Sequence, residues 1–188
     1  MVSEPAPQPI FYYDLGSPWC YLMAEQISSV LPIVPEWEPV HEASLGIAPG
    51  ELDRAEIARR AAELELQRLR WPPAWPPETR HAMLAASYAK RVGRAVAFSL
   101  AAFRQEVAGG RDLGDPDTVL IAAAASEMHP TAVTKGVALR SVSDALARAC
   151  ERARGAGVRS LPAIEVRGVV FDGCEALAGA AAALGGAR

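Results

Sequence analysis

The chain has 188 residues, of which 51% are hydrophobic and 22% are charged, and these values are typical of a folded globular protein rather than a disordered one. The formal net charge of -3 does not favour nucleic acid or an anionic lipid surface as a partner. No apolar run approaches the roughly 20 residues of a membrane-spanning helix. The first residues, MVSEPAPQPI, lack the basic start and apolar stretch of a signal peptide. We therefore expect a cytoplasmic protein that binds neither nucleic acid nor membrane.

The first part of the chain predicts a β-α-β unit. Residues 10–13, with the sequence IFYY, are short, apolar and rich in β-forming residues, which is typical of a buried strand. Ser17 then stands at a favoured N-cap position before Pro18, so a helix is predicted over about 18–30. A second strand is predicted over 36–40.

The middle of the chain predicts helices only. Apolar residues recur at steps of three and four over 51–70, which indicates an amphipathic helix, and the four prolines of residues 71–77 would end it. Further helices are expected at 78–92, at 94–108, from Asp115-Pro116 onward, at 131–140 and at 141–156.

The end of the chain returns to strands. A strand at 162–166, a tight turn at Arg167-Gly168 and a strand at 169–171 form a predicted hairpin, and an alanine-rich helix follows over 174–184. The resulting α/β order, βαβ…ββα with helices between, resembles a thioredoxin-like fold with an all-helical domain inserted in its middle. Residues 1–45 and 156–188 would form the thioredoxin-like domain, and 46–155 the helical insertion domain.

The cysteines and histidines predict neither disulfides nor a metal site. Cys20, Cys150 and Cys174 are odd in number and widely spaced, which argues against a disulfide framework. The sequence contains no CxxC, and none of its three histidines stands beside another histidine or a cysteine. A structural zinc site normally needs four clustered ligands, so we expect no metal.

Two motifs carry a family resemblance. Residues 13–22, YDLGSPWCYL, resemble the strand-loop-helix opening of the DsbA-like branch of the thioredoxin superfamily. Within this branch they are most similar to 2-hydroxychromene-2-carboxylate isomerases and kappa-class glutathione transferases, which carry Ser-Pro-aromatic where redox enzymes carry Cys-Pro-X-Cys. Residues 157–163, GVRSLPA, resemble the segment before the strand whose first proline is cis in this superfamily. The resemblance extends over nearly the whole chain.

Ser17 is the candidate catalytic residue. Unpaired N–H groups and the positive end of the dipole at a helix start favour an anion, so a thiolate would be stabilised there. The resemblance implies that the Ser17 hydroxyl bonds the sulfur of glutathione and keeps it ionised. An alternative is that Ser17 is only an N-cap, and the two roles are compatible.

Cys20 occupies the position of the second, resolving cysteine of the redox branch. It is either a small buried hydrophobic residue or a redox residue. The redox interpretation stays open because the isomerase pattern has no cysteine at this position. With serine at position 17, Cys20 cannot close the usual intramolecular disulfide. Cys174 would be its one alternative partner if the fold brings the two together.

The resemblance also implies a glutathione-binding wall. A cis bond before Pro162 would leave the backbone of Leu161 free to pair with this short peptide, whereas a trans proline would merely start the strand. Gly173-Cys174-Glu175 aligns with a Gly-Ser-Asp turn that holds the γ-glutamyl end of glutathione in kappa-class transferases, with Cys and Glu replacing Ser and Asp. Glu175 is equally an ordinary residue for the first turn of a helix.

The remaining candidates would form a substrate pocket. Pro18 and Trp19 follow Ser17 directly, and His41 lies in a region that borders the site in relatives. Trp71 begins a rigid Trp-Pro stretch that either covers a small aromatic substrate or packs against the helical insertion.

These expectations together predict an enzyme that uses glutathione or another low-molecular-weight thiol. It would isomerise a small conjugated or aromatic-derived substrate, in the manner of 2-hydroxychromene-2-carboxylate isomerase, or it would transfer the thiol to such a substrate. We also expect a homodimer, because such relatives usually are homodimers. Two alternatives stay open: a DsbA-like thiol-disulfide oxidoreductase that uses Cys20, and a catalytically silent thioredoxin-like module that binds peptides.

Overall fold

A four-stranded sheet forms the centre of the molecule. The computed structural model describes residues 8–47 and 52–185. The strand order is β2-β1-β3-β4, with β1 at Ile10–Tyr13, β2 at Glu36–Pro39, β3 at Ala163–Val166 and β4 at Val169–Asp172. Strand β1 runs parallel to β2 and antiparallel to β3, and β3 pairs antiparallel with β4. The predicted α/β, thioredoxin-like order is therefore confirmed.

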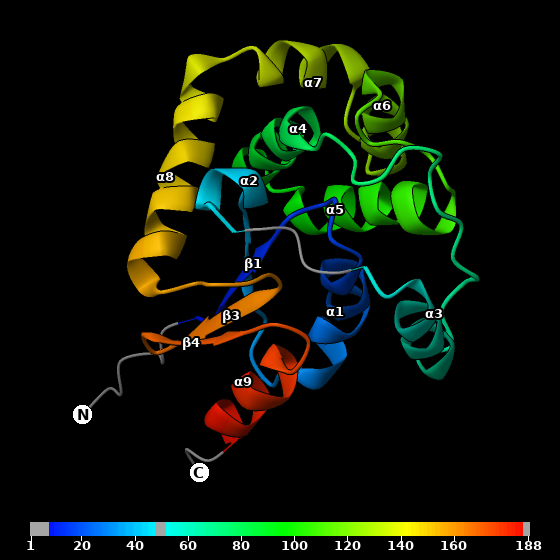
Figure 1. Cartoon of the computed structure of the whole chain (residues 1–188). Helices are drawn as coiled ribbons and strands as arrows, with labels where there is room; N and C mark the ends of the chain where they lie inside the picture. Colours follow the sequence, from blue (N-terminus) through cyan, green and yellow to red (C-terminus); the bar gives the residue numbers. More distant parts are fainter. Residues whose placement is uncertain (1–7, 48–51, 186–188) are drawn as a thin grey trace.

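Helices lie on both sides of this sheet. Helix α1 (Pro18–Val30) and helix α9 (Ala176–Gly185) pack against one another, and α9 covers β3 and β4. The long helix α8 (Arg140–Ala156) contacts the edge strand β2. Figure 1 shows α8 on the opposite side of the sheet from α1.

The other helices between β2 and β3 lie mainly above one end of the sheet, but one of them, α3, lies beside α1 (Figure 1). Their bounds are α2 Glu42–Leu45, α3 Arg54–Glu63, α4 Arg80–Arg91, α5 Ala95–Phe103, a π-helical turn η1 Arg104–Ala108, α6 Pro116–Ala125 and α7 Pro130–Val137. In the described ranges, none of the helices combines the length and the apolar character that a membrane crossing requires.

An aromatic cluster joins the sheet to these helices. The Phe11 and Trp37 rings meet edge to face at 5.1 Å, and Tyr13 lies between Trp37 and Phe103 of α5. The Tyr13 hydroxyl shares a buried hydrogen bond of 2.7 Å with the Ser99 hydroxyl of α5. This cluster fixes the end of β1, from which the candidate site begins.

The predicted helix at 51–70 is confirmed over its first half and wrong after Glu63. Helix α3 ends at Glu63, and Glu65 takes a positive φ of 54°. The Leu66 N–H donates to the Ala61 carbonyl and the Glu65 N–H to the Ala62 carbonyl, which is a Schellman ending. Because this ending uses glutamate instead of glycine, no residue at this point predicts the end of the helix. Residue 51 lies outside the described ranges.

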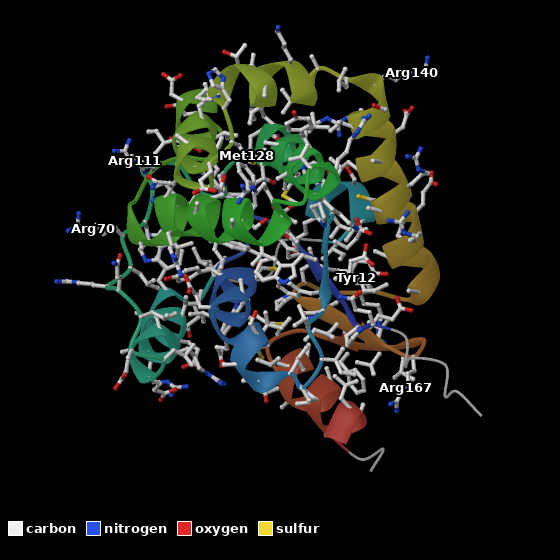
Figure 2. The ribbon with its side chains drawn as sticks, turned by 180° about the vertical axis from the view of Figure 1, so that it is seen from behind. Tyr12, Arg70, Arg111, Met128, Arg140 and Arg167 are labelled. Atoms are coloured by element: carbon white, nitrogen blue, oxygen red, sulfur yellow. The ribbon has the colours of Figure 1, made fainter. Side chains whose placement is uncertain are left out.

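Smaller differences occur at other helix ends. The predicted helix 94–108 changes to π geometry over η1, where the Gly109 N–H donates to the Arg104 carbonyl. The two expected helices at 131–140 and 141–156 are α7 and α8, with the break at Ala138 and Leu139. Figure 2 shows Arg140 beside the start of α8 and Arg167 at the turn between β3 and β4.

Candidate active site

Ser17 caps helix α1 at the end of strand β1. Its backbone is extended, and its Oγ atom accepts a hydrogen bond from the Cys20 N–H at 3.3 Å. Pro18 occupies the first helical turn, where its missing N–H costs nothing. Ser17 keeps 8% of its surface exposed, so the start of α1 is nearly covered.

Asp14 holds the loop that carries Ser17. Its buried carboxylate accepts hydrogen bonds from the Gly16 N–H at 2.9 Å and from the Glu42 N–H at 2.8 Å. Burial raises the pKa of Asp14, and these bonds act in the opposite direction. The carboxylate thereby ties the loop at the start of α1 to the first residue of α2. Sequence reasoning missed Asp14, although its place directly before a helix-capping loop was a usable signal.

Cys20 lies inside the protein. Its side chain is fully buried, and burial raises the pKa of the thiol well above its usual range, with the Ser17 hydroxyl opposing the shift in part. Cys174 is exposed, and both thiols are free. A neutral, inaccessible thiol is a poor nucleophile, so this geometry favours the interpretation of Cys20 as a small core residue.

The second wall of the site is formed at the start of β3. Tyr12 pairs with Ala163, so the strand register places Leu161 and Pro162 beside the loop that follows β1. The peptide bond between Leu161 and Pro162 is cis, as the resemblance implied, and both residues are buried. The Gly173 N–H donates to the Pro162 carbonyl at 2.8 Å, which brings the turn before α9 to the same edge.

A cavity of about 290 Å³ lies between α1, α3 and α9, and we call it the α1 cavity. Trp19, Leu22 and Met23 contribute apolar lining, and the predicted residues Cys174 and Glu175 also line the cavity. Glu175 is largely exposed, and its Oε1 atom lies 3.6 Å from Nη2 of Arg60 on α3. Arg60 was missed by sequence reasoning because nothing in its local pattern distinguishes it from a solvated helix residue.

A second cavity of about 290 Å³, which we call the Asp14 cavity, lies beside the loop that carries Ser17. Gly16, His41 and Glu42 line it together with Thr79. The His41 Nδ1 atom lies 2.7 Å from the Ser44 hydroxyl, and its Nε2 atom lies 3.8 Å from Glu78. Burial, and then the nearby Asp14, raises the pKa of Glu42 to about 7. Glu42 was also missed, since the rise in its pKa comes from burial in the fold and from Asp14, 28 positions earlier.

Trp71 lines neither of these cavities. Its ring meets the Trp75 ring edge to face at 5.1 Å, and the Arg54 guanidinium lies 5.1 Å from its centre. The structure thus places Trp71 in a packed contact beside α3.

The predicted residues fall into three groups: Ser17, Pro18, Leu161, Pro162 and Gly173 at the sheet edge; Trp19, Cys174 and Glu175 at the α1 cavity; and His41 at the Asp14 cavity. Trp71 and the buried Cys20 lie outside these groups.

No grouping of three or more His, Cys, Asp or Glu side chains that could hold a metal ion occurs in the described part of the chain. The chemistry available at the site comes from the helix start, the Ser17 hydroxyl and the carboxyl groups around it.

The chain belongs to the DSBA-like thioredoxin domain family, whose model matches residues 10–185. No curated protein matches the sequence.

Solved structures agree with this family. A 2-hydroxychromene-2-carboxylate isomerase is 15% identical with a TM-score of 0.81, and the match covers 95% of each chain. A protein from Streptomyces coelicolor described as a probable DsbA oxidoreductase is 17% identical with a TM-score of 0.75, over 96% of this chain and 91% of that one. A thioredoxin-like oxidoreductase from Silicibacter pomeroyi is 16% identical with a TM-score of 0.58, over 98% and 95%. At such identities these likenesses show the fold alone.

Proposed function

We propose that the protein is an isomerase or transferase that uses glutathione or another low-molecular-weight thiol, with Ser17 as its catalytic residue. The observation that carries this proposal is the place of Ser17 at the N-cap of α1, where the branch that performs disulfide chemistry has a cysteine. A hydroxyl cannot form a disulfide, but it can hydrogen-bond a thiolate.

The direction of the hydrogen bond between Ser17 and Cys20 supports this role. The Ser17 Oγ atom accepts the Cys20 N–H, so its own proton is left to donate, either to the Cys20 thiol or to the sulfur of a bound thiol. The positive end of the α1 dipole acts in the same direction and favours the ionised sulfur. When bound, the thiol would supply a nucleophilic sulfur that adds reversibly to a conjugated double bond.

Other groups of the protein are available to bind the remaining parts of such a thiol. The backbone at Leu161 offers an edge for a short peptide, and the turn before α9 offers the backbone N–H of Cys174 to a carboxylate. Glu175 is exposed and could bind an ammonium group, in competition with its present neighbour Arg60. The apolar wall of Trp19, Leu22 and Met23 suits a small conjugated substrate. A cytoplasmic location and a homodimer are parts of the same proposal.

A thiol-disulfide oxidoreductase that uses Cys20 is the second candidate. The names of the oxidoreductases among the similar structures favour it, and the burial and raised pKa of the Cys20 thiol count against it. A silent peptide-binding module is the third, and it would need none of these groups.

An activity assay separates the candidates. Glutathione-dependent isomerisation of 2-hydroxychromene-2-carboxylate and conjugation of small electrophiles would be measured for the wild type, Ser17→Ala and Cys20→Ala. We expect activity that falls by about 100-fold in Ser17→Ala and persists in Cys20→Ala, in line with the loss of a single stabilising donor. Disulfide reductase activity that disappears in Cys20→Ala would instead establish the oxidoreductase, and a complete lack of both activities would favour the silent module.

A further inference from the structure

A large basic groove lies on the other side of the molecule from the α1 cavity. It has a volume of about 550 Å³ and runs between α4 and α8, with the edge strand β2 at its base. Figure 1 shows these two helices above and beside the sheet, on the side away from α1 and α9. The groove shares no lining residue with the α1 cavity or the Asp14 cavity.

Both walls of the groove carry cations. Lys90 and Arg91 come from α4, and Arg148 and Arg152 come from α8 at a spacing that puts them on one face. Small residues between them, Ser87, Ser141 and Ala145, leave the space open.

Buried Glu38 compensates part of this charge. Its Oε2 atom lies 2.7 Å from Nζ of Lys90 and 2.6 Å from Nη2 of Arg152, so these two cations hold one carboxylate between them. Lys90 reaches a second carboxylate, Glu36, at 2.6 Å. With these two carboxylates counted against four cations, the groove keeps an excess of two positive charges in a protein whose net charge is -3.

The excess resides on two guanidinium groups that face the groove from opposite walls. Arg91 donates to the Ser141 hydroxyl at 2.8 Å. Neither Arg91 nor Arg148 forms an ion pair with any residue in the ranges 8–47 and 52–185. Planar guanidinium groups bind phosphate and carboxylate through paired hydrogen bonds. Two such groups with an excess of two charges match one compact dianion.

We infer that the groove between α4 and α8 binds a small organic molecule that carries a compact dianionic group, either a phosphate or a pair of carboxylates. Arg91 and Arg148 contact the dianion, while Glu38 keeps Lys90 and Arg152 in place on either side. The volume lies within the range of small-molecule sites and leaves room for the organic part of the ligand. This inference is independent of the proposed thiol chemistry.

The test is calorimetric titration of the full chain at constant ionic strength. Inorganic phosphate, pyrophosphate and succinate are the probes, and the variants are Arg91→Gln, Arg148→Gln and Ser17→Ala. Arg140→Gln is the matched control, because Arg140 lies on α8 like Arg148. It is the first residue of the helix, and its side chain is 94% exposed (Figure 2). Circular dichroism of each variant verifies the fold.

We expect saturable binding of at least one probe, weakened by about tenfold or more in Arg91→Gln and in Arg148→Gln, and unchanged in Arg140→Gln and Ser17→Ala. A preference for phosphate and pyrophosphate over succinate would identify a phosphate ligand, and the reverse preference a dicarboxylate. Lack of saturable binding by all three probes, or an equal loss in Arg140→Gln, would overturn the inference.

Discussion

The Oγ atom of Ser17 accepts a hydrogen bond from the backbone N–H of Cys20 at 3.3 Å, and this bond caps helix α1. The capping role and the proposed catalytic role therefore belong to the same hydroxyl group. Substitutions at this position separate them, because amide and carboxylate side chains also cap helices but have no hydroxyl to offer a sulfur.

Ser17→Ala should lower the free energy of unfolding by about 1 kcal/mol, since it removes the cap. Ser17→Asn should retain most of this stability, because asparagine is an equally favoured N-cap. Both variants should lose thiol-dependent activity to a similar extent. Urea denaturation followed by circular dichroism measures the stability. If Ser17→Asn kept wild-type activity, the cap alone would account for the serine.

The three cysteines should differ sharply in reactivity. Cys174 is exposed, whereas Cys20 and Cys150 are buried and burial raises the pKa of both thiols. In the folded protein at neutral pH, iodoacetamide should therefore label Cys174 first, and the other two should react only after denaturation. Mass spectrometry of the labelled peptides gives the rates. Labelling of Cys20 as fast as that of Cys174 would restore the oxidoreductase interpretation.

Glu106 should make the stability depend on pH. Its side chain is fully buried in η1, its Oε2 atom accepts the Leu113 N–H, and its Oε1 atom lacks a partner in the described part of the chain. Burial raises the pKa of Glu106 to about 8, so the folded protein keeps a proton that the unfolded chain loses near pH 4.5. Stability contributed by this group should therefore fall as the pH rises between these two values.

Glu106→Gln isolates this contribution, because glutamine imitates the protonated carboxyl group and does not titrate. A shift of one pKa unit corresponds to about 1.4 kcal/mol, so the variant should gain about 3–5 kcal/mol relative to the wild type between about pH 5 and pH 8. Denaturation curves at a series of pH values give the comparison. Parallel curves for the two proteins would contradict the raised pKa.

Two helical glycines should respond oppositely to alanine. A Cβ atom at Gly136 in α7 would lie 2.5 Å from the Tyr88 ring of α4, whereas one at Gly155 in α8 would meet no atom within 4 Å. Gly155→Ala should stabilise the protein by about 0.5–1 kcal/mol through helix propensity. Gly136→Ala should destabilise it by about 1–3 kcal/mol through overpacking. Thermal unfolding compares them, and a stabilised Gly136→Ala would mean that α7 is free to move away from α4.

The sequence predicted those parts of the fold that local signals determine. The Ser17-Pro18 start of α1, the Asp115-Pro116 start of α6 and the Arg167-Gly168 turn each combine a favoured residue with the required backbone shape, and each lies where it was predicted. The end of α3 was missed because Glu65 adopts the left-handed conformation that usually indicates glycine.

The candidate site was predictable only in part. The motif around Ser17 identified the helix start, and the motif at residues 157–163 implied the cis bond before Pro162. The carboxyl of Asp14, the raised pKa of Glu42 and the cations facing one another between α4 and α8 all depend on residues far apart in the chain, which only the fold brings together.

In the proposed function, Ser17 and the start of α1 hold a bound thiol in its ionised form. The most direct measurement is the ultraviolet difference absorbance of the thiolate when glutathione, or a thiol of the bacillithiol or mycothiol type, is titrated into the protein at neutral pH. We predict a saturable thiolate signal for the wild type and for Cys20→Ala, and none for Ser17→Asn. No signal for any of these thiols with the wild type, or an unchanged signal with Ser17→Asn, would show that the Ser17 hydroxyl does not hold a thiolate.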